Sequence, residues 1–271
     1  MSRIEEALAK AAQKQPPLTQ SQEHLSFKEQ ANTLPPPTAV DLANFPEEKL
    51  VVLKTPTLPE AEEFRKLKEA LLKTIQSKER FNNVILVSSA HKGEGKSLTT
   101  VNLAISLAQG YDHSVLIVDA EMRMPTCHRY LNITPEFGLS DYLKGDIVLS
   151  KALVPTGIGK LVLLPAGNSA QNPLELLSSN SMRRLMEEIR TRYHDRIIII
   201  DSPPTLLFAE TRALADFADV VVLVVREGQT SLEDIQECQK LLNNKIFGIV
   251  YNATQYVQPY NNYYYSSYYT E

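Results

Sequence analysis

VILVSSAHKGEGKSL, residues 84–98, is the stretch that decides the fold. Its apolar start predicts a buried strand, its glycines a tight loop, and its Lys-Ser-Leu end the beginning of a helix. Gly93 and Gly95 allow the backbone to curl, so that successive N–H groups point at phosphate oxygens next to the positive end of the helix dipole. The stretch therefore predicts a phosphate-binding P-loop.

Two side chains of this loop have direct chemical roles: Lys96 contacts the β- and γ-phosphates, and the Ser97 hydroxyl ligates Mg²⁺. We therefore expect ATP and Mg²⁺ as cofactors. Ala90 replaces the first glycine of the GxxxxGK[ST] pattern but keeps its small size. The alternative is an ordinary strand-to-helix turn with a surface lysine, which the flanking strand and helix disfavour. The loop residues assigned to the nucleotide are His91, Lys92, Gly93, Glu94, Gly95, Lys96, Ser97 and Leu98.

The rest of the chain alternates short apolar runs, rich in β-branched residues, with helical patterns. Such alternation predicts an α/β fold with a doubly wound, mostly parallel sheet and helices on both faces, as in P-loop NTPases. The expected strands are 84–87, 115–118, 161–164, 197–200, 220–225 and 246–250, and the expected helices are 59–77, 97–108, 173–192 and 232–242.

Composition divides the chain into three parts. Residues 1–58 are expected to hold a short amphipathic helix at 1–12 and a Pro- and Gln-rich linker, which buries too little apolar surface to fold. Residues 59–252 are expected to form the P-loop domain, and 253–271 a flexible tyrosine-rich tail that cannot fold by itself.

Charge and cysteine usage exclude some classes of protein. The net charge is −4 and no dense Lys/Arg block is present, which argues against a nucleic-acid-binding surface. Cys127 and Cys238 lie far apart without CxxC spacing, so the spacing indicates neither a disulfide framework nor a zinc site. With no apolar run of membrane-spanning length and no secretory signal, we expect a cytoplasmic protein.

Two expected strands end in acidic residues. Asp119 and Glu121 follow one at alternate positions, and Asp201 ends another. Single acids at such places often cap the next helix, but three of them with a P-loop favour a magnesium site. We assign Asp119 and Asp201 to Mg²⁺ or its waters. Asp119 or Glu121 is assigned to accept the proton of an attacking hydroxyl, and the residues leave open which of them does so.

From about residue 59 to 269 the chain resembles the bacterial tyrosine kinase family, the capsule and exopolysaccharide autokinases related to MinD- and ParA-type ATPases. The resemblance rests on the P-loop, the acidic motif at 119–123, the Asp-Ser-Pro-Pro motif at 201–204 and the tyrosine tail, with support from 138–145 and 172–177. It implies an ATP-dependent protein-tyrosine autokinase with Lys96, Asp119, Glu121 and Asp201 as catalytic residues.

The chain also departs from the family pattern. Glu121 replaces the usual second aspartate, which makes its role the less certain of the pair. His91 stands where the partitioning ATPases carry a signature lysine, which favours the kinase branch. A MinD/ParA-like ATPase switch without kinase activity, or a regulatory or inactive kinase relative, remain the alternatives.

The resemblance further implies an oligomeric ring, in which Glu62, Arg65 and Lys68 occupy the interface motif; an ordinary solvated helix face is the alternative. It places Arg226 and Asn252 near the adenine. It also implies a membrane-embedded polysaccharide chain-length regulator as activator, a tyrosine phosphatase as partner, and recruitment to the inner face of the membrane. Residues 1–12 are expected either to dock on that regulator or to form a disordered leader.

Seven of the twelve tyrosines lie in the tail, where no Lys or Arg accompanies them. We expect these phenols to accept phosphate, because a flexible tail can reach another active site. The alternatives are an aromatic oligomerisation segment, a base-stacking platform and plain low complexity. The expected acceptors are Tyr256, Tyr260, Tyr263, Tyr264, Tyr265, Tyr268 and Tyr269.

Overall fold

The computed structural model describes residues 49–76, 83–110, 112–192 and 195–254. The helix expected at 1–12, most of the linker and all seven tail tyrosines lie outside these ranges. Within the described ranges, no helix combines the length and apolar character that crossing a membrane requires.

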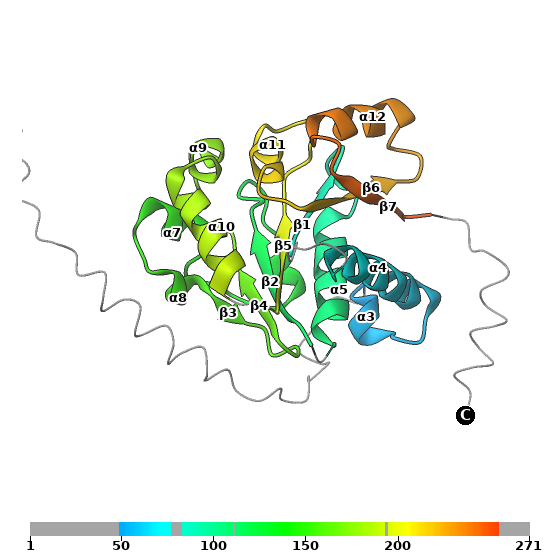
Figure 1. The fold of residues 1–271 in the computed structure, drawn as a ribbon, viewed down its shortest axis with the longest axis horizontal. Coiled ribbons are helices and arrows are strands. Elements are labelled where there is room, and N and C mark those ends of the chain that lie inside the picture. Colours follow the sequence, from blue (N-terminus) through cyan, green and yellow to red (C-terminus); the bar gives the residue numbers. More distant parts are fainter. Residues whose placement is uncertain (1–48, 77–82, 111, 193–194, 255–271) are drawn as a thin grey trace, which may run out of the picture. The chain divides into compact units, whose positions relative to one another are not determined.

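A seven-stranded sheet forms the centre of the described part of the chain (Figure 1), in the order β3-β4-β2-β5-β1-β6-β7. All neighbouring strands are parallel except β3 and β4, which confirms the predicted mostly parallel α/β fold. The strands are β1 Val84–Ser89, β2 Ser114–Asp119, β3 Val154–Pro155, β4 Leu161–Leu164, β5 Arg196–Asp201, β6 Val220–Arg226 and β7 Ile246–Asn252.

The strand order places the carboxyl ends of β1, β2 and β5 side by side. β5 lies between β1 and β2, and the register pairs Asp119 of β2 with Asp201 of β5, which in turn pairs with Val87 of β1. Because parallel strands end at the same edge, the loop after β1 and both acids lie at one edge of the sheet. This is where a doubly wound sheet binds its ligands.

Helices cover both faces of the sheet. Figure 1 shows α5, backed by α3 and α4, on one face and α10 on the other. Alternate residues of the central strands, such as Ile85 and Ile199, pack against α5, because successive side chains of a strand point to opposite faces. The helices are α3 Val51–Lys54, α4 Pro59–Gln76, α5 Lys96–Ala108, α6 Cys127–Tyr130, α7 Leu139–Lys144, α8 Leu149–Ala152, α9 Pro173–Leu177, α10 Asn180–Arg192, α11 Glu210–Ala215 and α12 Leu232–Leu241.

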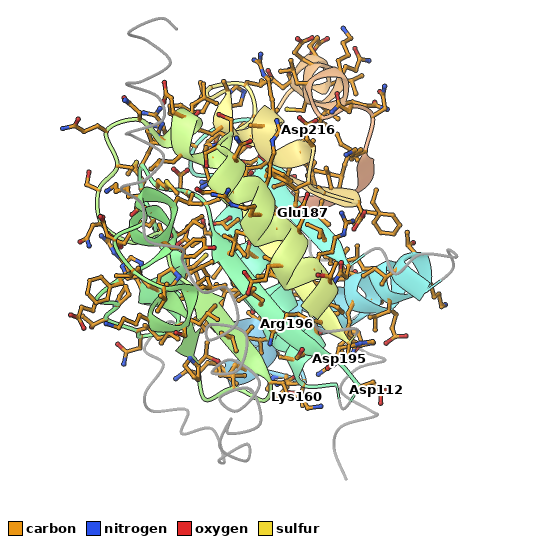
Figure 2. The ribbon with its side chains drawn as sticks, turned by 60° about the vertical axis from the view of Figure 1, so that its left-hand side comes forward. Asp112, Lys160, Glu187, Asp195, Arg196 and Asp216 are labelled. Carbon is orange, nitrogen blue, oxygen red and sulfur yellow. The ribbon has the colours of Figure 1, made fainter. Side chains whose placement is uncertain are left out.

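The second face is seen in Figure 2, where α10 lies across the sheet with Glu187 on its length. Lys160, Asp195 and Arg196 lie at the amino ends of β4 and β5 in the same view. These charged residues are therefore at the end of the sheet opposite the P-loop. They play no part in the site described below.

Two details differ from the sequence expectation. Ordered structure begins before residue 59: α3 packs on α5, and the Asn102 side chain accepts a bond from Val52 N and donates one to Lys49 O. The expected helix 173–192 is two helices, because the Ser179 hydroxyl accepts a bond from Met182 N and so caps the start of α10.

Candidate active site

The loop between β1 and α5 has the backbone conformation of a phosphate cradle. Gly93 and Gly95 have φ values of 79° and 97°, in the left-handed region that favours glycine. A Cβ at Gly95 would lie 2.1 Å from Nδ2 of Asn252, so a side chain there would strain the backbone and displace the Asn252 amide from the loop. α5 begins at Lys96, directly after this glycine, as the sequence predicted.

Side chains at the ends of β6 and β7 hold the carbonyl groups of this loop. Asn252 Nδ2 donates to Glu94 O at 2.8 Å, and Arg226 Nη1 donates to Gly93 O at 3.0 Å. Gln229 Nε2 donates to Lys92 O at 3.1 Å. Arg226 and Asn252 therefore bond to the loop itself, and their expected place near the adenine stays a prediction. Gln229 was missed because it stands in a turn that carries no motif.

The front of the loop is fixed by its own side chains, by Thr230 between β6 and α12, and by Asp234 of α12. The Glu94 carboxylate accepts a bond from His91 N at 2.8 Å and another from the Thr230 hydroxyl. The His91 ring lies 3.2 Å from the carboxylate of Asp234 at the start of α12. His91 and Glu94 therefore shape the loop in this structure.

Lys96 faces the acids that end β2 and β5. Its Nζ lies 3.3 Å from Oε2 of Glu121. Burial lowers the pKa of Lys96, but the charges of Asp201 and Glu121 outweigh burial and raise the pKa above its ordinary value. The ammonium is therefore charged and points into the group of acids. In this position it could also bind phosphate oxygens.

Asp201 is fully buried at the end of β5. Its carboxylate accepts bonds from the hydroxyls of Thr100, at 3.2 Å, and of Ser97, and from the Cys127 thiol at 3.4 Å. Burial raises the pKa of Asp201, although the Lys96 charge and these bonds oppose the rise. Ser97 and Asp201, both predicted metal ligands, are therefore in contact.

Asp119 is also fully buried, and only one of its oxygens is satisfied. Oδ1 accepts a bond from Glu121 N at 3.2 Å, whereas Oδ2 has no hydrogen-bond partner among the described residues. Burial and the charge of Asp201 raise the pKa of Asp119 well above its ordinary value. An unpaired buried carboxylate oxygen is costly unless a cation binds it.

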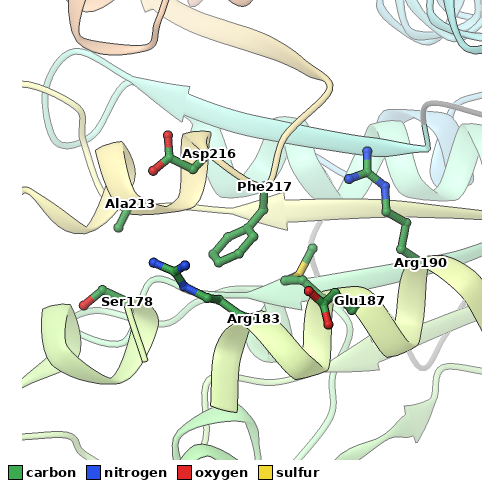
Figure 3. Close-up of a pocket in the computed structure, with 8 residues that line it drawn as sticks. Ser178, Arg183, Glu187, Arg190, Ala213, Asp216 and Phe217 are labelled. Atoms are coloured by element: carbon green, nitrogen blue, oxygen red, sulfur yellow. The ribbon is translucent and has the colours of Figure 1, made fainter. Parts of the chain in front are cut away.

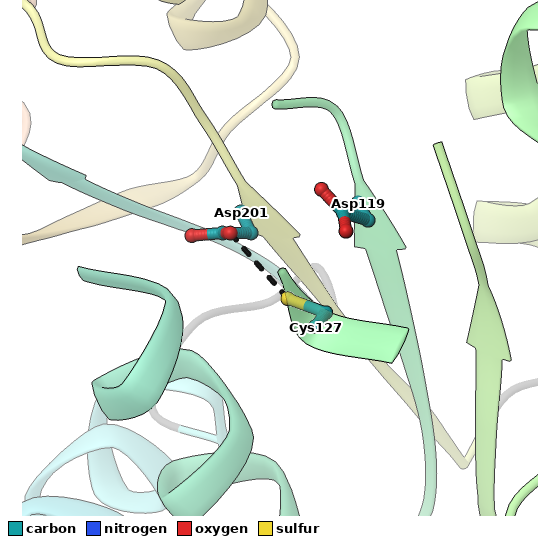
Figure 4. A group of neighbouring side chains, drawn as sticks. All are labelled: Asp119, Cys127 and Asp201. Atoms are coloured by element: carbon teal, nitrogen blue, oxygen red, sulfur yellow. Dashed lines mark hydrogen bonds between the residues drawn. The ribbon is translucent and has the colours of Figure 1, made fainter. Parts of the chain in front are cut away.

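These residues fit a divalent cation. Carboxylates of Glu121 and Asp201 act on the Lys96 ammonium, and the carboxyl group of Asp119 lies in the same group as Asp201. Donor atoms of Asp119, Asp201 and Cys127 lie within 4.8 Å of one another (Figure 4). The two aspartates and the Ser97 hydroxyl supply the oxygen ligands that Mg²⁺ prefers.

The chain turns after Asp119 and does not continue as an extended strand. Met122 N bonds to Ala120 O at 3.0 Å, and Glu121 turns back toward Lys96. Glu121 Oε1 accepts a bond from Arg123 N at 3.2 Å. Both acids reach the site, although by a turn and not by a shared strand face.

Arg123 has a partner that the sequence did not indicate. Its Nε and Nη2 donate to Oε1 of Glu210 at 2.9 and 2.6 Å, and its guanidinium lies 4.6 Å from the centre of the Phe208 ring. Lys92 approaches the same ring at 5.3 Å. Glu210 lies 87 residues after Arg123, so no local pattern could have linked the two.

The residues expected at an oligomer interface lie on α4, and two of them interact within the chain. Arg65 Nη1 lies 2.6 Å from Oε2 of Glu62, and Arg65 also donates to Pro56 O. Lys68 lies 3.8 Å from the carboxylate of Glu69. The i, i+3 pair expected of an ordinary helix face is thus present, and an intersubunit role stays a prediction.

A groove of about 370 Å³ lies elsewhere, between α9, α10 and the end of α11 (Figure 3). Arg183 and Glu187 of α10 face Asp216 and Phe217 across it. None of the eight lining residues belongs to the predicted site. The chemistry of the P-loop edge, and not the volume of this groove, therefore identifies the candidate active site.

Comparison with known proteins shows the family of the chain. A family model described as an AAA domain matches residues 82–247. The tyrosine-protein kinase YwqD of Bacillus subtilis is 30% identical over 210 residues, which cover 76% of this chain and 86% of YwqD. The chain belongs to the bacterial tyrosine-protein kinases.

Other members of this family differ in length. EpsB of Ralstonia solanacearum is 33% identical over 207 residues, which cover 75% of this chain. The chain spans about a quarter of the length of EpsB, because only 27% of that protein is matched.

Solved structures place the chain in the same family. The kinase domain of the Escherichia coli tyrosine kinase ETK superposes with a TM-score of 0.69 at 28% identity, over 78% of this chain and 85% of that one. MinD from Pyrococcus horikoshii, with a TM-score of 0.51 at 20% identity, covers 62% of this chain and 68% of that one and shares the fold alone.

Proposed function

We propose that the chain is an ATP-dependent protein-tyrosine autokinase that phosphorylates the tyrosine cluster at its own C-terminus. One observation carries the proposal: a P-loop lysine and three carboxylates from two further segments meet at one edge of the sheet. Membership of the tyrosine-protein kinases supports the same reading.

The loop residues from His91 to Leu98 would hold the phosphates of ATP. Their N–H groups and the start of α5 attract anionic oxygens, and Lys96 would move from Glu121 to the β- and γ-phosphates. Ser97, Asp119 and Asp201 would hold Mg²⁺, which when bound neutralises charge on the phosphate oxygens. Arg226 and Asn252, which fix the loop from behind, would lie beside the nucleoside.

A tyrosine phenol is a poor nucleophile until its proton is accepted. Both carboxylate oxygens of Glu121 are engaged, one with Lys96 and the other with backbone N–H groups. Oδ2 of Asp119 accepts no hydrogen bond from the described residues, so the carboxyl group keeps lone pairs for the metal and for the proton of the phenol. We therefore assign proton acceptance to Asp119 and assign Glu121 to orienting Lys96 before ATP binds.

The tail begins immediately beyond β7, whose last residue, Asn252, bonds to the P-loop. Residues 255–271 could extend about 60 Å at roughly 3.5 Å per residue, far enough to reach the site of a neighbouring protomer. Glu62, Arg65 and Lys68 on α4 would form the ring that presents that neighbour. Phosphates added to the tail would then repel each other and the acids of the site, and so loosen the ring.

The cellular role follows from the same family. We propose that this kinase regulates polymerisation and export of an extracellular polysaccharide, activated by a membrane-embedded chain-length regulator and reversed by a tyrosine phosphatase. In that setting the chain would work in the cytoplasm at the inner face of the membrane. The region 1–58 is the segment available to dock there.

The test is transfer of radiolabel from [γ-³²P]ATP to the purified full chain. We expect labelling of the wild type, loss of labelling when the seven tail tyrosines are changed to Phe, and loss with Lys96→Met. Tyr251→Phe is the matched control, because Tyr251 is an exposed tyrosine outside the tail. Labelling of the seven-Phe variant at the wild-type level would exclude the tail as acceptor. ATP hydrolysis without phosphotyrosine in the wild type would favour the MinD-like switch.

A further inference from the structure

The thiol of Cys127 lies among the acids of the site. Cys127, Asp119 and Asp201 are all completely buried, and Figure 4 shows the thiol between the ends of β2 and β5. The thiol donates to Asp201 Oδ2 at 3.4 Å, and a carboxylate oxygen of Asp119 belongs to the same group. Oδ2 of Asp119 has no hydrogen-bond partner among the described residues. The cysteine spacing gave no sign of this arrangement, because the two acids come from strands distant in sequence.

One sulfur and two carboxylates form a different donor set from the oxygens that Mg²⁺ requires. Mg²⁺ prefers six oxygen ligands, whereas Zn²⁺ binds thiolate, imidazole and carboxylate groups in tetrahedral sites. We propose that Asp119, Cys127 and Asp201 form a second, inhibitory site for Zn²⁺ that overlaps the proposed magnesium site.

The geometry is close to what Zn²⁺ needs. Zn–S and Zn–O distances of about 2.3 and 2.1 Å place sulfur and oxygen about 3.6 Å apart in a tetrahedral site. Cys127 Sγ and Asp201 Oδ2 are 3.4 Å apart. The outermost donor atoms, within 4.8 Å, would close by about 1 Å. The fourth position is left for water or a nucleotide phosphate.

Binding changes the bonds of the site in a simple way. The Cys127 thiol releases its proton to solvent as the sulfur–zinc bond forms, and both carboxylates become ligands. Asp119 and Asp201 are then no longer available to Mg²⁺. Since Zn²⁺ exceeds Mg²⁺ in affinity for sites that include sulfur, low concentrations of Zn²⁺ would inhibit phosphoryl transfer. The inhibition rests on the proposed kinase function, but metal binding does not.

The binding test uses Co²⁺ as a coloured substitute for Zn²⁺, with the full chain free of tag and nucleotide. We expect the near-ultraviolet thiolate-to-Co²⁺ absorption band at one equivalent of Co²⁺, and its loss when Zn²⁺ is added. The matched control is Cys238→Ser, because the chain has two cysteines and Cys127 is then its only thiol. The band should persist in Cys238→Ser and vanish in Cys127→Ser. Zn²⁺ should bind Cys127→Ser at least about tenfold more weakly.

Absence of the band from both the wild type and Cys238→Ser overturns the proposed site, whether or not Cys127→Ser folds. A band of equal strength in folded Cys127→Ser does the same. Zn²⁺ inhibition of tyrosine phosphorylation to the same extent in both single variants overturns the inhibitory role. A band in a protein without kinase activity supports the metal site and refutes the proposed kinase, so the two failures are distinguishable.

Discussion

Asp141 provides the sharpest test of how the domain is stabilised. It lies in α7, is buried, and joins the start of that helix to the loop after β4. Its Oδ2 accepts bonds from Gly138 N at 2.9 Å and Asn168 N at 3.2 Å, and Oδ1 accepts one from Asn168 Nδ2 at 2.9 Å. Asp141→Asn keeps the shape of the side chain and removes its charge.

The size of the effect follows from these three bonds. A hydrogen bond to a charged group contributes about 1.5–3 kcal/mol, and a neutral one about 0.5–1.5 kcal/mol. Loss of charge from three bonds, with partial rearrangement of the Asn168 amide, should lower the free energy of unfolding by about 2–3 kcal/mol. Asp146→Asn is the matched control: Asp146 lies just after the end of the same helix but is exposed, so its effect should stay within about 0.5 kcal/mol.

The difference in the free energy of unfolding between Asp141→Asn and Asp146→Asn should depend on pH in a defined direction. Burial would raise the pKa of Asp141, but the bonds from Asn168 and Gly138 prevail and lower it. A carboxylate with a lowered pKa contributes stability above its unfolded pKa, about 3.9, and this contribution is lost as the pH falls through the folded pKa. The difference in the free energy of unfolding between the two variants should therefore be largest at pH 7 and shrink below about pH 4.

Urea unfolding followed by circular dichroism measures both the loss of stability at pH 7 and its dependence on pH. We expect the midpoint of Asp141→Asn to fall by about 1 M relative to Asp146→Asn at pH 7. Equal midpoints at pH 7 would refute the role of the three bonds. A gap that stays constant down to pH 3 would show that the stabilisation does not depend on the charge.

Three further predictions concern the active site. Gly95→Ala should abolish binding of a fluorescent ATP analogue because its Cβ meets Asn252, whereas Gly145→Ala, with a similar φ of 86° and nothing described within 4 Å, should bind normally; equal binding would contradict the clash. Glu210→Gln should lower the free energy of unfolding in urea by about 1–3 kcal/mol, because it leaves the Arg123 guanidinium facing a neutral amide. The pKa values of Asp119 and Asp201 are both raised, so protons compete with Mg²⁺, and calorimetry should find weaker Mg²⁺ binding at pH 6 than at pH 8; pH-independent binding would contradict this.

Most of the sheet could be predicted from sequence because its central strands are buried on both faces. Runs such as 197–200 and 220–225 are continuously apolar and β-branched, and each is a strand of the structure. The acids of the site were found for the same reason: Asp119 and Asp201 directly follow such runs, and parallel strands end at a common edge.

Features that depend on contacts between distant segments could not be predicted. The placement of Cys127 beside Asp201 joins residues 74 positions apart, and the Gln229 bond to the P-loop joins residues 137 apart. Neither residue stands in a recognisable pattern. The short helix α3 had a local signal, the apolar run at 50–53, but Pro-rich neighbours concealed it.

The bonds from Arg226, Gln229 and Asn252 to three consecutive P-loop carbonyls have an energetic consequence for ligand binding. A free glycine loop would lose conformational entropy each time it closed on a phosphate. Here the loop is ordered when the domain folds, so the ligand meets a preorganised cradle and most of its interaction energy goes into affinity. Through their bonds to the loop, these three residues thus affect how tightly ATP is held.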